Sequence, residues 1–122
     1  MENYFKGRTG IKRLTKAIGY SFSGFRAAFQ NEEAFRQEIL LIIILVPLAF
    51  YIANNAIEIV LLIFSTLMVP IIELVNSAIE ATVDRISMKK NKLSMRAKDI
   101  GSAAVFLSLV NLFTVWLIII FY

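Results

Sequence analysis

The residues best suited to chemistry lie in one segment, ELVNSAIEATVDR, at residues 73–85. Its acidic and amide side chains belong to Glu73, Asn76, Glu80 and Asp84. Their spacings of i, i+3, i+7 and i+11 place them within about 80° of one another on an α-helix. Ala78 and Ala81 are small enough to allow close contact with a second helix. The segment therefore predicts a helix that carries one polar stripe, formed by these four acidic and amide residues.

The composition limits what chemistry the stripe could do. The 122 residues include no Cys and no His, which excludes disulfides, Cys or His metal sites, thiol nucleophiles and imidazole bases. Gly19 and Gly24 have the spacing of a Walker loop, but Phe25 and Arg26 follow where Lys and Ser or Thr are required. The motifs of protein kinases are also absent from the sequence. Carboxylates remain as the candidate bases and metal ligands.

The elements that must position these carboxylates are strongly apolar, because 58% of the residues are hydrophobic and the mean hydropathy is +0.71. Residues 39–57 and 100–122 carry no charge, and their lengths of roughly 28 and 34 Å as helices match a hydrocarbon core of about 30 Å. A third apolar run, 59–72, crosses only if it extends to about residue 80. We predict an all-α membrane protein, a helical bundle with transmembrane helices at about 37–54, 56–82 and 99–121.

The first 36 residues are predicted to form an amphipathic helix region at the cytoplasmic surface of the membrane. Apolar side chains recur there at spacings of three and four, on one helical face: Ile11, Leu14, Ile18, Phe22, Phe25 and Phe29. Lys12, Arg13 and Lys16 fall on other faces. Such a helix lies at an interface, with its aromatic side in lipid or against the bundle. We interpret residues 1–122 as one integral membrane domain.

The basic residues predict the orientation. The chain has 13 Lys and Arg against 9 Asp and Glu, and all 13 either precede the first span or lie between the second and third. The Asn54-Asn55 turn and the C-terminus carry none. By the positive-inside rule, the N-terminus and the 83–98 loop are expected in the cytoplasm, with the C-terminus on the opposite side. This one-sided distribution favours a membrane surface or an anionic nucleotide as the partner, rather than nucleic acid.

Depth distinguishes the acids of the polar stripe. If the second span enters near Ala56, Glu73 lies about 26 Å along it and Glu80 about 36 Å. Glu73 is then just inside the hydrocarbon and Glu80 at the headgroups, which suits a reaction between a membrane alcohol and a soluble anionic cosubstrate. An acid inside the bilayer is a functional candidate by default. Asp84, beside Arg85, is instead interpreted as a partner of Arg or Lys across a helix interface.

Three motifs together resemble one family. AIGYSFSGFRAAFQNEEAFRQE (17–38), ELVNSAIEATVDR (73–85) and RAKDIGSAAV (96–105) are similar to the prokaryotic diacylglycerol kinases of the Gram-negative type. The resemblance implies a multi-pass homotrimer of the cell inner membrane, with active sites shared between protomers and the C-terminus in the periplasm. It implies Mg²⁺-dependent transfer of the ATP γ-phosphate to the 3-hydroxyl of diacylglycerol, which gives phosphatidic acid.

The resemblance also implies roles for individual residues. Glu73 would be the general base, Glu32 and Glu80 would bind Mg²⁺ with the ATP phosphates, and Asn76 would support that site. The nucleotide would be served further by Arg13, Tyr20, Lys98 and Asp99. The lipid substrate would be bound by Glu73 together with Ser21, Arg26, Arg36, Gln37, Glu38, Ser102 and Trp116. Lys89, Lys90 and Asn91 depart from the family pattern and are assigned no role.

Other functions stay open at this point. Within the enzyme class, the alternative substrate is a polyprenol such as undecaprenol, and the AFRQE stretch at 34–38 favours diacylglycerol. A small membrane transporter also uses an intramembrane Glu, although nearer the midplane and with an even number of spans. A membrane assembly protein without enzymatic activity would need only the packing residues and the basic loops. The last two predict no ATP turnover.

Overall fold

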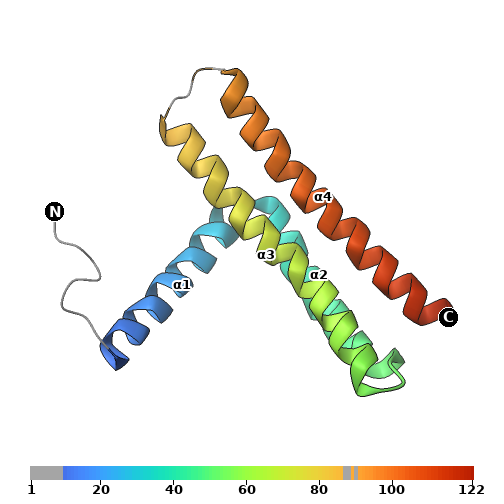
Figure 1. Cartoon of the computed structure of the whole chain (residues 1–122). Coiled ribbons are helices and arrows are strands. Elements are labelled where there is room, and N and C mark those ends of the chain that lie inside the picture. The colour runs from blue at the N-terminus through green and yellow to red at the C-terminus, as the bar shows by residue number, and fades with distance from the viewer. Residues whose placement is uncertain (1–9, 87–88, 90) are drawn as a thin grey trace. The chain divides into compact units, whose positions relative to one another are not determined.

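The computed structural model describes residues 10–86, 89 and 91–122. They form four helices, α1 (Ile11–Asn31), α2 (Glu33–Ile52), α3 (Ala56–Ile86) and α4 (Lys92–Phe121), and the described residues contain no strand (Figure 1). The predicted all-α class is confirmed. The chain divides into two compact units, Met1–Asn31 with α1 and Glu32–Tyr122 with α2, α3 and α4.

Helices α2, α3 and α4 are each long and apolar enough to cross a membrane, which makes the chain a multi-pass membrane protein. Their lengths are 20, 31 and 30 residues. The sequence predicts spans at about 37–54, 56–82 and 99–121. In the structure α2 begins four residues earlier, α3 ends four residues later and α4 begins seven residues earlier, each within a charged segment. A charge ends an apolar run without ending a helix, because the backbone hydrogen bonds continue for as long as the side chains permit. Asp84 of the polar stripe and the start of the 96–105 motif lie on these helical extensions, whereas Glu73, Asn76 and Glu80 lie within the predicted span.

Asparagine side chains begin α3 and α4. Asn55 Oδ1 accepts a hydrogen bond from the Glu58 backbone N–H at 3.0 Å, while Glu58 Oε1 accepts one from the Asn54 backbone N–H at 3.0 Å. This arrangement is similar to a capping box, except that Glu58 accepts from the residue before the N-cap. Asn91 Oδ1 accepts from the backbone N–H groups of Leu93 and Ser94 in the same way. Asn91 is thus the N-cap of α4, and Lys90 lies outside the described residues.

Helix α3 is the centre of the second unit, since it packs against both α2 and α4. Figure 1 shows α3 and α4 running side by side in opposite directions. The buried core cluster draws on all three helices and consists of Ala49, Leu62, Val69, Leu112 and Trp116. Both prolines, Pro47 in α2 and Pro70 in α3, lie inside continuous helices. This core fixes the part of α3 that precedes the polar stripe.

Helix α1 is amphipathic, as predicted, and most of its large apolar side chains are exposed. Ile11 and Phe22 keep 82% and 68% of their surface exposed. The rings of Phe22 and Phe25 meet edge to face, with centroids 6.4 Å apart. An exposed aromatic face of this kind needs lipid or protein against it, which fits an interfacial helix.

Candidate functional site

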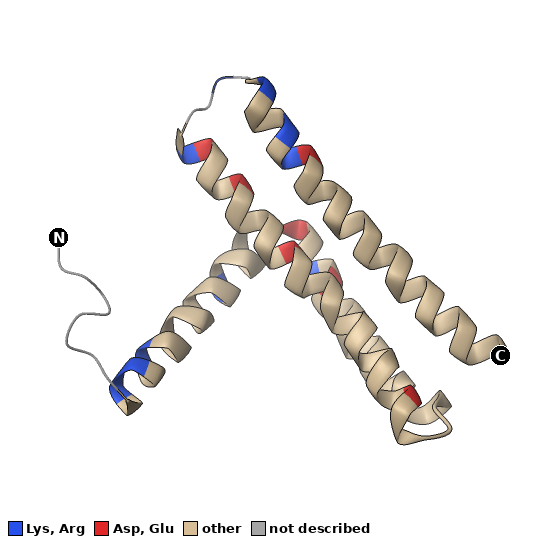
Figure 2. Ribbon diagram, viewed as in Figure 1, with Lys and Arg blue, Asp and Glu red and all other residues tan. Residues whose placement is uncertain are grey.

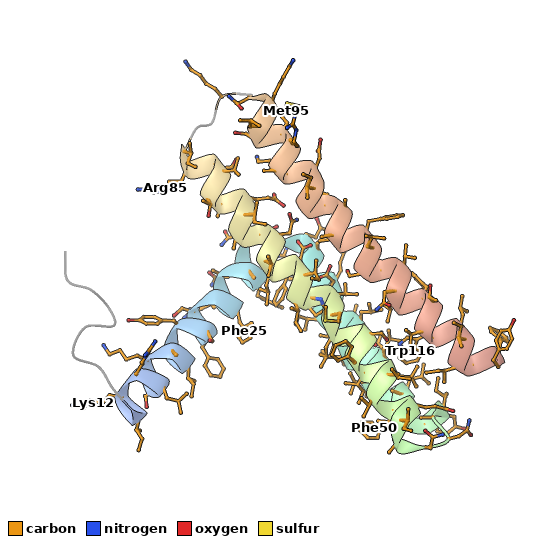
Figure 3. All side chains as sticks on the ribbon, in the orientation of Figure 1. Lys12, Phe25, Phe50, Arg85, Met95 and Trp116 are labelled. Atoms are coloured by element: carbon orange, nitrogen blue, oxygen red, sulfur yellow. The ribbon has the colours of Figure 1, made fainter. Side chains whose placement is uncertain are left out.

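The polar stripe is buried along part of its length. Glu73 and Asn76 are only 5% and 6% exposed, whereas Glu80 is half-buried. Figure 2 shows acidic residues along α3, while the charges of α4 are confined to its N-terminal part. The stripe therefore runs from the interior of the bundle to its charged end, where Figure 3 shows Arg85 near the end of α3 and Met95 near the start of α4.

Asn76 and Glu80 form a pair on this stripe. Asn76 Nδ2 donates a hydrogen bond to Glu80 Oε1 at 2.9 Å. The two residues are four apart, so a helix places them one above the other and the contact needs no distortion of the backbone. A hydrogen bond to a carboxylate is stronger than one between neutral groups, so this contact orients the acid.

Glu73 stands among other carboxylates. It interacts electrostatically with Glu32 at the start of α2 and with Glu80 on its own helix, and Glu38 of α2 interacts with it as well. Like charges this close repel one another unless protons or a cation compensate them. The second unit therefore brings together four residues that the sequence singled out: Glu32, Glu38, Glu73 and Glu80. Such a set can accept a proton and attract a cation.

The acids fit Mg²⁺ only if other ligands join them. Within the described residues, no group of three or more acidic side chains is arranged to hold a metal. Mg²⁺ nevertheless prefers oxygen ligands and is often bound by one or two carboxylates together with substrate phosphates and water. Glu32 is suited to such a site because it lies at the N-cap of α2 in an extended conformation and its side chain makes no capping hydrogen bond. The donor set thus fits a metal that arrives with a phosphate ligand.

Asp84, the last residue of the polar stripe, joins α3 to α4. Its Oδ1 lies 2.6 Å from Lys98 Nζ, and both side chains are a little under half exposed. An ion pair across a helix interface is what the sequence predicted for Asp84, and the partner is Lys98. Because the pair is solvated, its contribution to stability is about 0–1 kcal/mol. Lys98 is therefore held at the charged end of the bundle next to the polar stripe.

The remaining predicted residues of α2 follow Glu32 along the helix. Arg36 and Gln37 are exposed, and Glu38 is buried with an Oε1 atom that has no hydrogen-bond partner within the described residues. A buried carboxylate oxygen without a partner is costly in an apolar environment. Glu38 is thus poised to accept a hydrogen bond from another molecule, such as a lipid or a second subunit.

The predicted residues of α1 are all exposed and belong to the first compact unit: Arg13, Tyr20, Ser21 and Arg26. The Ser21 hydroxyl donates to the Ala17 carbonyl at 3.0 Å, an ordinary contact for Ser within a helix. The acids of α3 belong to the other compact unit. The assignment of these four α1 residues to nucleotide and lipid stays a prediction.

The predicted residues of α4 lie far apart. Asp99 and Ser102 are exposed near its start, whereas Trp116 follows 14 residues after Ser102, which is about 21 Å along the helix. Trp116, labelled in Figure 3, belongs to the buried core, and its indole N–H donates to Thr66 Oγ1 at 3.1 Å. The fold thus brings Lys98 to the polar stripe and places Trp116 in the packed interior, away from it. A role for Trp116 toward lipid chains stays a prediction.

Two residues of the second unit escaped sequence reasoning. Thr66 accepts the Trp116 hydrogen bond, and Gly101 meets the side chain of Asn76. Both interrupt apolar runs, and small or hydroxylated residues inside a membrane span are the usual sign of a helix contact. That sign marks the positions, but it does not reveal which residue of the other helix each one meets.

Comparisons with known proteins give a consistent result. A family model described as "Prokaryotic diacylglycerol kinase" matches residues 19–120. The chain is 51% identical over 112 residues to the diacylglycerol kinase of Pseudomonas aeruginosa, which covers 92% of this chain and 91% of the relative. It is 49% identical over 111 residues to the diacylglycerol kinase of Escherichia coli strain K12, with 91% of each protein covered. The diacylglycerol kinase of Helicobacter pylori strain 26695 is 38% identical over 107 residues, or 88% of this chain and 84% of the relative.

Proposed function

This chain belongs to the prokaryotic diacylglycerol kinase family, and from that premise we propose that it transfers the γ-phosphate of ATP to the 3-hydroxyl of diacylglycerol. The products are ADP and phosphatidic acid. The new bond joins the lipid oxygen to the γ-phosphorus, the bond from that phosphorus to the β-γ bridging oxygen breaks, and the hydroxyl proton leaves to a base. The family relatives are named for diacylglycerol, which is why we choose this alcohol over a polyprenol.

One observation supports the chemistry most directly. Glu73 is 5% exposed and lies on the same face of α3 as Glu80, seven residues away, or about 10 Å along the helix. A reaction between a bilayer alcohol and a water-borne nucleotide needs one group at each of these two depths. In a chain without His or Cys, a carboxylate is the only strong base available near neutral pH.

The proposed mechanism assigns the proton to Glu73. Its carboxylate accepts a hydrogen bond from the lipid 3-hydroxyl and removes the proton as the oxygen attacks the phosphorus. Glu73 is only 5% exposed, and its burial limits the access of water, which would otherwise compete with the lipid as the acceptor. Phosphoryl transfer depends mainly on alignment and on compensation of charge, so a small helical scaffold is sufficient.

Glu80 and Glu32 would hold Mg²⁺, with Asn76 orienting Glu80 through the 2.9 Å hydrogen bond. Bound Mg²⁺ would supply positive charge to the phosphate oxygens. On the nucleotide side, four further residues are proposed to bind ATP: Arg13, Tyr20, Lys98 and Asp99. On the lipid side, the proposed contacts are Ser21, Arg26, Arg36, Gln37, Glu38, Ser102 and Trp116.

We also propose that the active enzyme is a homotrimer of the cell inner membrane whose sites combine residues of neighbouring protomers. The buried Glu38 Oε1 atom, which has no hydrogen-bond partner within the described residues, supports assembly, because a second subunit could supply its donor. Shared sites would also supply carboxylates that a single chain does not bring together. The Lys and Arg distribution supports cytoplasmic placement of the N-terminus and the 83–98 loop, with the C-terminus in the periplasm.

A substrate panel tests the proposal. The purified protein, in detergent or reconstituted in lipid, is incubated with Mg²⁺ and labelled ATP together with diacylglycerol, undecaprenol or no lipid. We expect labelled phosphatidic acid from diacylglycerol alone. A product from undecaprenol only would make the protein a polyprenol kinase, and no lipid-dependent transfer would favour a transporter or an assembly protein.

A further inference from the structure

Gly101 of α4 is buried directly against the Asn76 side chain of α3. A β-carbon added to Gly101 would collide with Asn76 Oδ1, and it would lie 3.1 Å from Asn76 Cγ. The other three described glycines, Gly10, Gly19 and Gly24, have nothing within 4 Å of the same position. The close approach is therefore particular to Gly101, where the missing side chain makes room for an amide from the neighbouring helix.

The two ends of the Asn76 amide have different environments. Nδ2 donates to Glu80 Oε1, and because a carboxylate only accepts hydrogen bonds, the amide nitrogen must face Glu80. Oδ1 then points at the Gly101 Cα–H, and this buried oxygen has no conventional hydrogen-bond partner within the described part of the chain. A Cα–H group is a weak donor that recurs at close helix contacts. The orientation of Asn76 is thus determined by Glu80 on one side and Gly101 on the other.

We propose that Gly101 is a positioning residue for phosphoryl transfer, acting through Asn76 on Glu80. This inference about Gly101 rests on the proposed function, because the role of Glu80 toward Mg²⁺ and ATP is part of that function. Glycine is the only residue type that leaves the position of Asn76 Oδ1 free, and in that position Asn76 donates its hydrogen bond to the Glu80 carboxylate. Gly101 itself touches neither nucleotide nor lipid in this scheme.

A role in helix packing alone makes a different prediction. A methyl group at position 101 collides with the far end of the Asn76 side chain, so rotation of that side chain relieves the clash without moving the backbone. The Asn76 β-carbon would lie 3.8 Å from the new methyl group, which is ordinary van der Waals contact. The helices can therefore stay together in Gly101→Ala, while the hydrogen bond to Glu80 is broken. A pure packing role would instead require α3 and α4 to separate, whatever residue occupies position 76.

The first measurement compares the KM for Mg-ATP with the KM for diacylglycerol. In Gly101→Ala we expect the KM for Mg-ATP to rise about tenfold, the factor for losing one hydrogen bond to a charged group, with the KM for diacylglycerol within about twofold of the native value. Gly24→Ala is the matched control, because it makes the same change in helix propensity at a position with open space. It should keep both constants. A native KM for Mg-ATP in Gly101→Ala would overturn the proposal.

The second measurement is a thermal-unfolding cycle, which needs no activity. Gly101→Ala should lower the melting temperature in the native background and raise it in the Asn76→Ala background, where the methyl group fits and the glycine's excess freedom is removed. Equal destabilisation in both backgrounds would overturn the proposal. If Gly101→Ala alone does not fold, recovery by Asn76→Ala supports the proposal and no recovery refutes it. If the native protein does not phosphorylate diacylglycerol, the proposed function is wrong. The thermal-unfolding cycle still decides in that case whether Gly101 positions Asn76.

Discussion

The Thr66 hydroxyl is the acceptor that holds Trp116 in the core, and its removal is a sharp test of the packing between α3 and α4. Thr66 Oγ1 accepts from the Trp116 indole N–H at 3.1 Å and donates to the Leu62 carbonyl at 2.7 Å. Thr66 is fully buried and Trp116 is 7% exposed. Thr66→Val keeps the shape of the side chain, so its main effect is to leave a buried indole N–H without a partner.

The size of the effect follows from that geometry. An unpaired buried donor costs about 1–3 kcal/mol in general, and hydrogen bonds between membrane helices average about 0.6 kcal/mol in double-mutant cycles, with a maximum of about 1.7. We therefore expect Thr66→Val to lower the free energy of unfolding by about 1 kcal/mol. In the Trp116→Phe background the donor is already gone, so the same substitution should cost close to zero.

Reversible unfolding in mixed detergent micelles, followed by far-UV circular dichroism, measures these differences. Thr114→Val is the matched control, because the Thr114 hydroxyl makes the same contact with a carbonyl four residues earlier, at 2.7 Å, on the exposed side of α4. If Thr66→Val costs no more than Thr114→Val, or costs the same with and without Trp116, the indole hydrogen bond does not stabilise the bundle and the reasoning is wrong.

Three further predictions concern the polar stripe. Glu73→Gln keeps the shape but removes the base, so kcat should fall at least about 100-fold while the melting temperature is retained; turnover at the native rate would refute the assignment. Glu80→Gln should raise the Mg²⁺ concentration needed for half-maximal activity, and an unchanged Mg²⁺ titration would contradict its role as a ligand. Asp84→Asn breaks the solvated ion pair with Lys98 and should lower the free energy of unfolding by at most about 1 kcal/mol. Added salt should reduce this loss. A larger or salt-independent loss would show that the pair is more buried than its exposure indicates.

Features that depend on one helix were predictable from the sequence. The charge-free runs gave the three spans, because chain length and hydrophobicity alone decide whether a helix can cross a bilayer. The helical period placed Glu73, Asn76 and Glu80 on one face, and the structure joins Asn76 to Glu80 by a hydrogen bond. Helix ends were less predictable. Lys92 begins α4 seven residues before the expected start because the Asn91 side chain caps it there, a signal that a count of charges does not contain.

Features that depend on two helices were not predictable in detail. Asp84 was expected to pair across an interface, but the identity of Lys98 as its partner depends on the axial register of α4 against α3. Thr66 and Trp116 are 50 residues apart in the chain, and no local pattern connects them. Register is set by the combined fit of both helix surfaces and their connection, so it becomes visible only when the helices are packed.

Two polar contacts between α3 and α4, together with the close approach of Gly101 to Asn76, also explain how this register is maintained. Thr66 and Asp84 are 18 residues apart on α3, and their partners Trp116 and Lys98 are 18 residues apart on α4, so both intervals span about 27 Å. Equal intervals in opposite directions mean that the helices run antiparallel without slipping. In lipid, apolar side chains gain little by facing one another rather than the acyl chains, so hydrogen bonds and close packing of small residues must select one alignment. A slip of one turn, about 5.4 Å, would break both outer contacts and would also move Gly101 away from Asn76. The same contacts that stabilise the bundle therefore keep Glu80 beside the residues that position it.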